Sequence, residues 1–202
     1  KSHYEFSSDT LKLYDQSRQR EIPIAIYKPT SKVSGKQKIV IFSHGYGQNK
    51  GGDYLAYSYL TEFLATKGFF VVSIQHELST DSLLPLTGNP QIVRRPFWER
   101  GADNILYVIN ELKRTNPDLD FKHITLIGHS NGGDMTAIFP KKYNKVDLNK
   151  CDVLYHYKPF SNNKLKKNDT GYDSRRFILQ NDKYCNWYIL YMDEKYSGTS
   201  LL

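Results

Sequence analysis

The chain has 202 residues, of which 39% are hydrophobic and 24% charged. This length and composition fit one globular domain with a substantial core. The formal net charge of +7 would attract anionic substrates or membrane surfaces, but the lysines are scattered and no nucleic-acid-binding motif is present. No apolar run approaches the roughly 20 residues of a membrane-spanning helix, so stable membrane insertion is not expected.

The N-terminal part is predicted to form an antiparallel hairpin. Residues 10–15 alternate between apolar and polar side chains as an exposed strand does, and residues 20–27 have the pattern of its partner. Pro23 suggests that this second strand lies at an edge of the sheet, because proline cannot donate to a strand ladder. Polar residues 31–37 then form a turn.

Buried strands and amphipathic helices alternate after the hairpin. Residues 38–43 and 69–74 are continuous apolar runs, which are typical of parallel strands covered on both faces. The segment 53–67 between them has helical spacing through Leu55, Tyr59, Leu60, Phe63 and Leu64. Gly68 is a plausible C-cap for that helix.

The second loop, helix and strand, over residues 75–127, form a longer unit than the first. A loop over residues 75–94 contains three proline or glycine breakers, and residues 100–114 follow as a second amphipathic helix. Residues 124–127 are the next short buried strand. The order of a hairpin and then βαβαβα predicts an α/β fold, a mostly parallel sheet with helices on both faces.

The most informative motif is Gly128-His129-Ser130-Asn131-Gly132, between this last strand and a helix predicted over residues 133–139. A G-x-S-x-G sequence in a strand–turn–helix context is typical of a nucleophilic serine. The serine requires a strained backbone there, and Gly128 and Gly132 avoid the clash that larger residues would cause. The alternative is a glycine-rich turn that only permits close packing.

A nucleophilic serine also needs donors for the oxyanion that it creates. One is expected to be the backbone N–H of Asn131, at the start of the helix. The other is expected from the loop His44-Gly45-Tyr46-Gly47 after the first buried strand, with Tyr46 as donor and Gly45 allowing close approach. Both loops follow carboxyl ends of neighbouring parallel strands and should converge. Without the serine motif, His44-Gly45 would be an ordinary strand-ending turn.

These segments resemble the α/β-hydrolase superfamily, and in particular its dienelactone hydrolase and platelet-activating-factor acetylhydrolase-like branch. The resemblance covers about residues 10–140 and is carried by residues 15–24, 42–47, 94–103 and 128–133. It implies an α/β-hydrolase-type sheet with an N-terminal antiparallel hairpin. It also implies cleavage of a small-molecule carboxylic ester or lactone by a Ser-Asp-His triad, through an acyl-enzyme on Ser130. No metal or organic cofactor is implied.

The catalytic base and acid are harder to assign from the sequence. The resemblance fades beyond residue 140, and residues 141–202 are interpreted as a shortened or atypical C-terminal part of a single domain. His156 is the only histidine after Ser130 and is the candidate base, with Asp152 as the candidate acid. They are only four residues apart, closer than two separate strand-end loops allow. A structural role for His156 on a strand is the alternative.

Other candidates have weaker patterns. His129 is interpreted as structural, and His76 ends a strand on the catalytic side, where it would line a pocket. Tyr54, Phe97 and Trp98 would shape an acyl pocket or belong to the core.

Two other functions compete with hydrolysis. The resemblance implies a catalytic histidine after the last strand, and no histidine follows His156. This absence favours a pseudo-hydrolase that acts as a binding module. The net charge favours a binder of nucleic acid or anionic surfaces. Cys151 and Cys185 lack metal-ligand spacing, but they would form one disulfide in an exported protein. The chain begins at Lys1 without an initiator Met. Removal of a signal peptide, with a secreted or periplasmic location, fits this, and so does a shortened chain.

Overall fold

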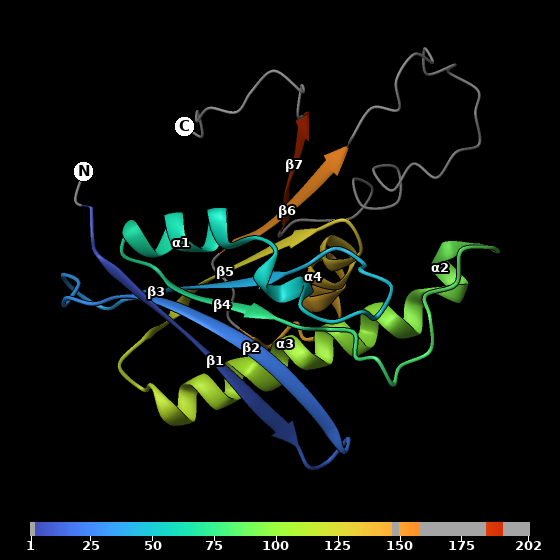
Figure 1. Ribbon diagram of the computed structural model, residues 1–202, viewed down its shortest axis with the longest axis horizontal. Helices are drawn as coiled ribbons and strands as arrows, with labels where there is room; N and C mark the ends of the chain where they lie inside the picture. Colours follow the sequence, from blue (N-terminus) through green and yellow to red (C-terminus); the bar gives the residue numbers. More distant parts are fainter. Residues whose placement is uncertain (1–2, 147–149, 158–184, 192–202) are drawn as a thin grey trace.

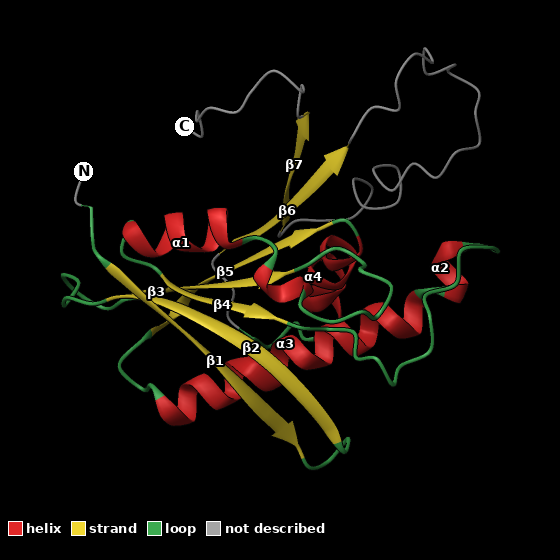
Figure 2. Ribbon diagram, viewed as in Figure 1, coloured by secondary structure: helices red, strands yellow, loops and turns green. Residues whose placement is uncertain are grey.

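The computed structural model describes residues 3–146, 150–157 and 185–191. Its strands form one sheet, with helices on either side (Figures 1 and 2). The elements, in chain order, are β1 (Phe6–Asp15), β2 (Arg20–Pro29), β3 (Lys38–Ser43), the short 3₁₀ helix η1 (Asp53–Leu55), α1 (Ser58–Thr66), β4 (Phe70–Ile74), α2 (Pro90–Val93), α3 (Arg95–Thr115), β5 (Asp120–His129), α4 (Asn131–Lys142), β6 (Lys150–Tyr157) and β7 (Cys185–Tyr191).

The sheet is mostly parallel, as the sequence predicts. Its strand order is β1-β2-β4-β3-β5-β6-β7. The hairpin β1–β2 is antiparallel and joins the rest through an antiparallel β2–β4 pair, whereas β4, β3, β5, β6 and β7 run parallel to one another. Because β3 and β5 are neighbours, the loops that follow them emerge side by side.

The prediction that β2 is an edge strand is wrong. β2 lies between β1 and β4, and β1 occupies the edge. Pro23 is tolerated because the pairing of β2 with β4 begins only at Ile24. Its carbonyl accepts a hydrogen bond from the N–H of Gln75 just beyond that pairing, so the missing proline N–H costs no ladder bond to β4.

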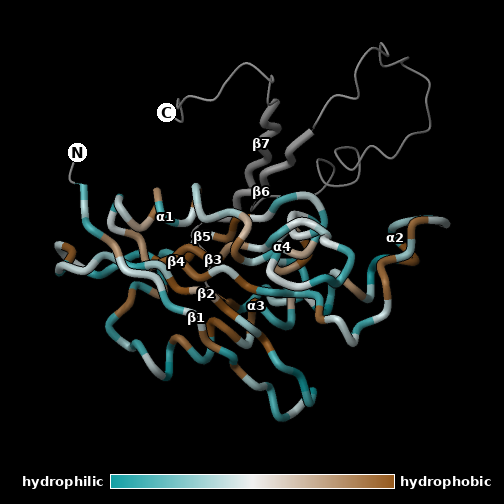
Figure 3. Tube along the Cα trace, in the orientation of Figure 1, coloured by the Kyte–Doolittle hydropathy of each residue, from teal (hydrophilic) through white to brown (hydrophobic). Residues whose placement is uncertain are grey.

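One face of the sheet is covered by α3 and α4. The buried residues of α3 repeat with helical spacing, as predicted, and pack on apolar side chains of the central strands. Figure 3 shows hydrophobic residues concentrated in the central strands. The residues of the two helices in this core are Ala102, Ile105, Val108, Ile109, Leu112 and Phe139.

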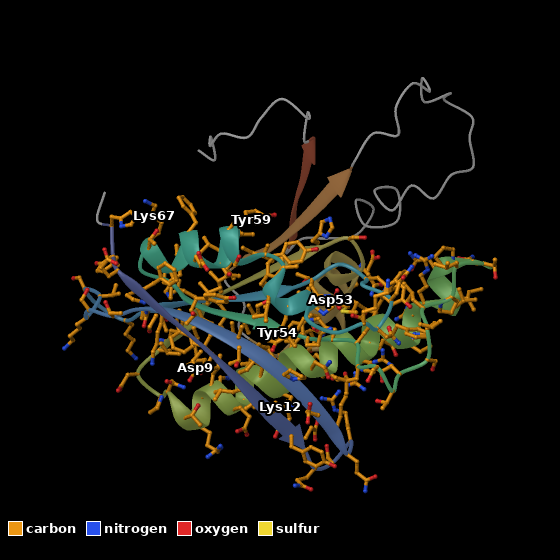
Figure 4. All side chains as sticks on the ribbon, in the orientation of Figure 1. Asp9, Lys12, Asp53, Tyr54, Tyr59 and Lys67 are labelled. Atoms are coloured by element: carbon orange, nitrogen blue, oxygen red, sulfur yellow. The ribbon has the colours of Figure 1, made fainter. Side chains whose placement is uncertain are left out.

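The opposite face is covered by α1. Ala65 is fully buried against the sheet, and Leu60 and Leu64 pack around it. Tyr59 and Phe63 were also expected on the apolar face, but they are 70% and 42% exposed. Figure 4 shows Tyr59 on the outer side of α1. Gly68 follows the helix with a φ of 97°, in agreement with its predicted capping role.

Several elements are longer than the sequence patterns indicate. The helix α3 begins at Arg95 rather than at residue 100, and the loop of residues 75–94 contains the short α2. The strand β5 begins at Asp120, with an irregular register where its polar start joins the apolar run at Ile124. None of the helices in the described ranges has both the length and the apolarity that crossing a bilayer demands.

Beyond α4, two more parallel strands extend the sheet. The predicted strand-like run around His156 is β6, and β7 pairs with it so that Cys151 and Cys185 are register partners. The structure describes the backbone of these strands, and the proposed disulfide between the two cysteines stays a prediction.

Candidate active site

Ser130 occupies the turn between β5 and α4. Its backbone has φ of 50° and ψ of −120°, a conformation that non-glycine residues adopt rarely and only where the surroundings enforce it. Ser130 is exposed, and its hydroxyl neither caps α4 nor forms a hydrogen bond with any residue in the described ranges. The chain therefore presents a hydroxyl to solvent from a strained backbone position.

The glycines on either side of Ser130 are required by contact, as the sequence predicts. A Cβ on Gly128 would collide with the backbone of Gly132 and lie 2.6 Å from Thr136 Oγ1. A Cβ on Gly132 would collide with the carbonyl groups of Ser43 and His44 at the end of β3. The first turn of α4 is thus pressed directly against the start of the loop after β3.

Two backbone N–H groups are available beside this turn. Asn131 is the first residue of α4, so its N–H has no partner within the helix. Neither this N–H nor that of Tyr46 donates a hydrogen bond to another residue of the described ranges. The Tyr46 side chain is held from the other side, because its hydroxyl accepts a hydrogen bond from the Leu84 N–H at 3.0 Å.

The loop after β3 is also fixed through Tyr57 and His129. The Tyr57 hydroxyl accepts a hydrogen bond from the Gly45 N–H at 3.2 Å and lies 2.6 Å from Nδ1 of His129. This single hydroxyl therefore connects the Gly45 N–H of the loop after β3 with the His129 ring of β5. A Cβ on Gly45 would lie only 2.7 Å from Nδ1 of His129. His129 therefore has a structural role, as expected.

Below the loops lies a buried histidine pair. Nδ1 of His44 bonds to the Gly45 carbonyl at 2.7 Å, and its Nε2 accepts the His76 N–H at 3.0 Å. These bonds define a neutral His44 with its proton on Nδ1. Burial lowers the pKa of His44. Burial, with the nearby charges of Arg20 and Arg100, lowers the pKa of His76 well below its ordinary value.

His76 does not line a pocket. It is 1% exposed, and its Nε2 donates to the Ser43 hydroxyl at 2.9 Å. On the other side of the ring lies Asn104, whose Oδ1 accepts a hydrogen bond from Arg18. The amide nitrogen Nδ2 of Asn104 therefore faces Nδ1 of His76, at 3.4 Å. This chain connects the hairpin turn, α3 and the ends of β3 and β4.

A buried carboxylate contacts the residue after Ser130. Oε1 of Glu77 accepts a hydrogen bond from Nδ2 of Asn131 at 2.8 Å, and Oδ1 of Asn131 accepts one from Trp98 Nε1 at 2.9 Å. Trp98 was a candidate for the acyl pocket, but it is 3% exposed and belongs to this network. Burial raises the pKa of Glu77 to about 7, although the charge of Arg100 opposes the rise.

The loop after β4 is anchored by an arginine pair. Arg20 donates to both oxygens of Asp81 at 2.8 and 2.7 Å, and Arg100 lies 3.3 Å from the same carboxylate. Burial raises the pKa of Asp81, but the hydrogen bonds from Arg20 and the Leu78 N–H outweigh burial, so the net shift is downward. Asn49 donates to the Asp81 and Ser82 carbonyls, which joins this loop to the one that carries Tyr46.

The candidate acid and base both lie on β6. Asp152 is the register partner of Ile127 on β5, and His156 is that of Leu190 on β7. Residues four apart on an extended strand have Cα atoms about 13 Å apart, so a direct hydrogen bond between Asp152 and His156 requires the strand to bend. Their side chains lie outside what the structure describes, and their catalytic roles stay predictions.

The sequence patterns missed most of this polar network. Glu77, Asn104 and Asp81 are polar residues that a hydropathy pattern assigns to the surface, yet Glu77 and Asn104 are almost fully buried. The one sequence feature that indicates this network is the run of polar residues Gln75-His76-Glu77 directly after a buried strand. In residues 3–146, no group of three or more histidine, cysteine or acidic side chains has a geometry that could hold a metal ion.

Comparisons with known proteins identify the architecture. No protein-family model matches the sequence, and no curated protein sequence matches it. Among solved structures, it is similar to a bacterial heroin esterase, with a TM-score of 0.55 and 19% identity over 74% of this chain and 44% of that one. It is also similar to esterase B from Lactobacillus rhamnosis, with a TM-score of 0.54 and 19% identity over 76% of this chain and 50% of that one. A third similar structure is a hyperthermophilic esterase from the archaeon Pyrobaculum calidifontis, with a TM-score of 0.52 and 16% identity over 73% of this chain and 43% of that one.

The chain spans half or less of the length of these three esterases. At such identities the similarity concerns the fold. The mixed sheet, the helices on both faces and these neighbours together show that the chain has the α/β-hydrolase-type fold.

Proposed function

We propose that the protein is a serine hydrolase that cleaves a carboxylic ester or lactone through an acyl-enzyme on Ser130. The observation that carries the proposal is the backbone of Ser130, which is strained, exposed and placed between a buried strand and a helix N-terminus. Such a strand–serine–helix turn is the nucleophile elbow of α/β-hydrolases. The esterase activity of the structural neighbours supports the same reaction class.

In this proposal the N–H groups of Tyr46 and Asn131 form the oxyanion hole. Both groups are unused by other residues in the described ranges, and the contact between Gly132 and the end of β3 brings their loops together. Donors aimed at a developing oxyanion contribute about 100- to 1,000-fold in rate each. We further propose a relationship to the dienelactone hydrolase and platelet-activating-factor acetylhydrolase-like branch, on the motifs of residues 15–24, 42–47, 94–103 and 128–133.

The chemistry follows from these roles. The Ser130 oxygen forms a bond to the substrate carbonyl carbon while a general base takes its proton, and the carbonyl π electrons move to the oxyanion. Collapse expels the alkoxide, which receives that proton, and leaves the acyl group on Ser130. Water then repeats the two steps and releases the acid. We propose His156 as the base and Asp152 as its acid partner.

Labelling with a fluorophosphonate tests the proposal. The wild-type protein is expected to gain one adduct on Ser130, and Ser130→Ala to gain none. Ser82→Ala is the matched control, because Ser82 is an exposed serine in the neighbouring loop with an ordinary backbone. Hydrolysis of a short-chain p-nitrophenyl ester should be lost with Ser130→Ala and kept with Ser82→Ala. A folded wild-type protein that is neither labelled nor active would instead be the pseudo-hydrolase.

A further inference from the structure

Glu77 is a buried acid that the proposed reaction does not use. It follows β4, is 1% exposed and comes from a part of the chain 54 residues from its partner Asn131. A buried carboxyl group is costly unless it has a specific partner. Here that partner is Asn131, whose backbone N–H is expected to face the oxyanion. Glu77 can therefore influence the reaction through Asn131.

The orientation of the Asn131 side chain is determined by chemistry. The indole N–H of Trp98 is a donor only, so the atom that faces it at 2.9 Å must be Oδ1 of Asn131. The other amide atom, Nδ2, then points to Oε1 of Glu77 at 2.8 Å. Trp98 from α3 and Glu77 from the loop after β4 thus clamp the first residue of α4 from two sides.

The second oxygen of Glu77 has a different environment. Oε2 is buried without a hydrogen-bond partner in the described ranges, and Nε2 of His44 lies 3.6 Å away. That nitrogen already accepts the His76 N–H, so it presents no proton to the carboxylate. Among the side chains around Glu77, Asn131 therefore supplies a hydrogen-bond donor to Oε1, and none in the described ranges supplies one to Oε2.

We propose that Glu77 is a positioning residue, which holds Asn131 so that its backbone N–H stays directed at the oxyanion formed on Ser130. This inference rests on the proposed function. It assigns Glu77 no contact with substrate, because the effect passes through the Asn131 side chain. A misplacement of such a donor reduces transition-state stabilisation more than substrate binding.

The charge of Glu77 should matter as well as its shape. The charged or titratable groups that face it are His44 from the loop after β3, Asp53 from η1, Asp81 from its own loop and Arg100 from α3. Burial raises the pKa of Glu77 to about 7. When it ionises, a negative charge appears beside the residue that supplies the oxyanion donor, and it opposes the charge of the oxyanion.

Three variants separate these effects. Glu77→Gln keeps the acceptor for Asn131 and removes the charge, Glu77→Ala removes both, and Glu99→Gln is a control at a surface ion pair with Arg95. With a p-nitrophenyl ester, Glu77→Ala should lower kcat by about 10- to 100-fold with little change in KM. Glu77→Gln should restore kcat, and its ratio to wild type should increase as the pH rises through about 7. The control should match wild type at each pH.

A second measurement does not depend on activity. The backbone and side-chain amide resonances of Asn131 should shift with the ionisation of Glu77 in wild type, and the shift should be absent in Glu77→Gln. If Ser130 is not labelled in wild type, the proposed function fails, and these resonances still decide whether Glu77 controls Asn131. Equal kcat in Glu77→Ala and wild type, or Asn131 resonances insensitive to Glu77 ionisation, would overturn the inference.

Discussion

Gly132 lies against the backbone of Ser43 so closely that a Cβ on it would overlap the Ser43 carbonyl group. One residue belongs to the first turn of α4 and the other ends β3. Their contact determines how near the N–H groups of Asn131 and Tyr46 come to each other. The glycine is therefore required by the approach of two backbones, and not by its own φ angle, which is not in the left-handed region.

Gly132→Ala should therefore affect both stability and the site. The new methyl group meets backbone atoms that cannot rotate away, so we expect a loss of about 1–3 kcal/mol in the free energy of unfolding. In the molecules that still fold, α4 must shift from β3 and separate the two donors. Fluorophosphonate labelling per folded molecule should then slow by tenfold or more. Urea denaturation and labelling rates at matched folded fractions measure the two effects.

Gly101→Ala is the matched control for this substitution. Gly101 lies where α3 meets α4, and a Cβ there would collide with the side chain of Met135. Another rotamer of Met135 moves its Sδ and Cγ away, and only its Cβ, 2.9 Å from the new methyl group, requires a small shift of the backbone, so the effect should stay local. We expect some loss of stability and an unchanged labelling rate per folded molecule. An equal slowing in both variants would mean that labelling reports stability and not the Gly132 contact.

Tyr57→Phe tests the link between the loop after β3 and β5. It removes the hydroxyl that accepts from the Gly45 N–H and forms a hydrogen bond with Nδ1 of His129. Two polar groups then lose their partner, which should cost about 1–3 kcal/mol of unfolding free energy in urea titrations. Tyr59→Phe is the control, because Tyr59 is 70% exposed on α1. Its change should stay within about 0.5 kcal/mol, the usual range for surface substitutions.

Glu77 predicts a specific dependence of stability on pH. Its pKa is about 7 in the folded protein against an ordinary value of 4.5. Between these values the unfolded chain releases a proton that the folded protein retains, so the free energy of unfolding decreases as the pH rises and levels off above the folded pKa. Glu77→Gln does not titrate. It should gain stability relative to wild type across this window, by up to about 3 kcal/mol at pH 8.

Urea titrations at several pH values measure this difference directly. Glu99→Gln provides the baseline, since Glu99 pairs with Arg95 at the surface. A Glu77→Gln difference that stays constant between about pH 5 and 8 would show that Glu77 is ionised throughout and that its buried position does not retain a proton.

The buried strands β3 and β4 could be predicted from the sequence almost residue by residue. The strand β3 has the bounds that its apolar run indicates, and Gly68 has the positive φ expected after α1. The same holds for the contacts of Gly128 and Gly132, because a tight strand-to-helix turn leaves few alternatives. At these positions, local sequence and close packing impose the same requirement.

The buried polar network could not be predicted in this way. Glu77, His44 and Asn131 come from three separate segments, and only the sheet order β4-β3-β5 brings them together. Periodicity describes one element at a time and treats polar residues as exposed. The prediction of an edge strand from Pro23 is wrong for the same reason. A proline is tolerated in β2 because the pairing of β2 with β4 ends at Ile24, and periodicity within one strand does not show this. Contacts between distant segments carry the details of the candidate site.

The catalytic base is the prediction with the largest expected effect. If His156 takes the proton of Ser130, His156→Gln should lower ester turnover by about 100- to 10,000-fold, while the fold is unchanged by circular dichroism. His123→Gln is the control, since His123 is an exposed residue paired with Asp120 at the start of β5. If Asp152 is its acid partner, as proposed, Asp152→Asn should also lower turnover, by about tenfold or more. An extended strand holds the Cα atoms of Asp152 and His156 about 13 Å apart, so this role requires β6 to bend until the two side chains meet. Full activity in His156→Gln would assign the base to another residue, and unchanged turnover in Asp152→Asn would remove Asp152 as the acid partner.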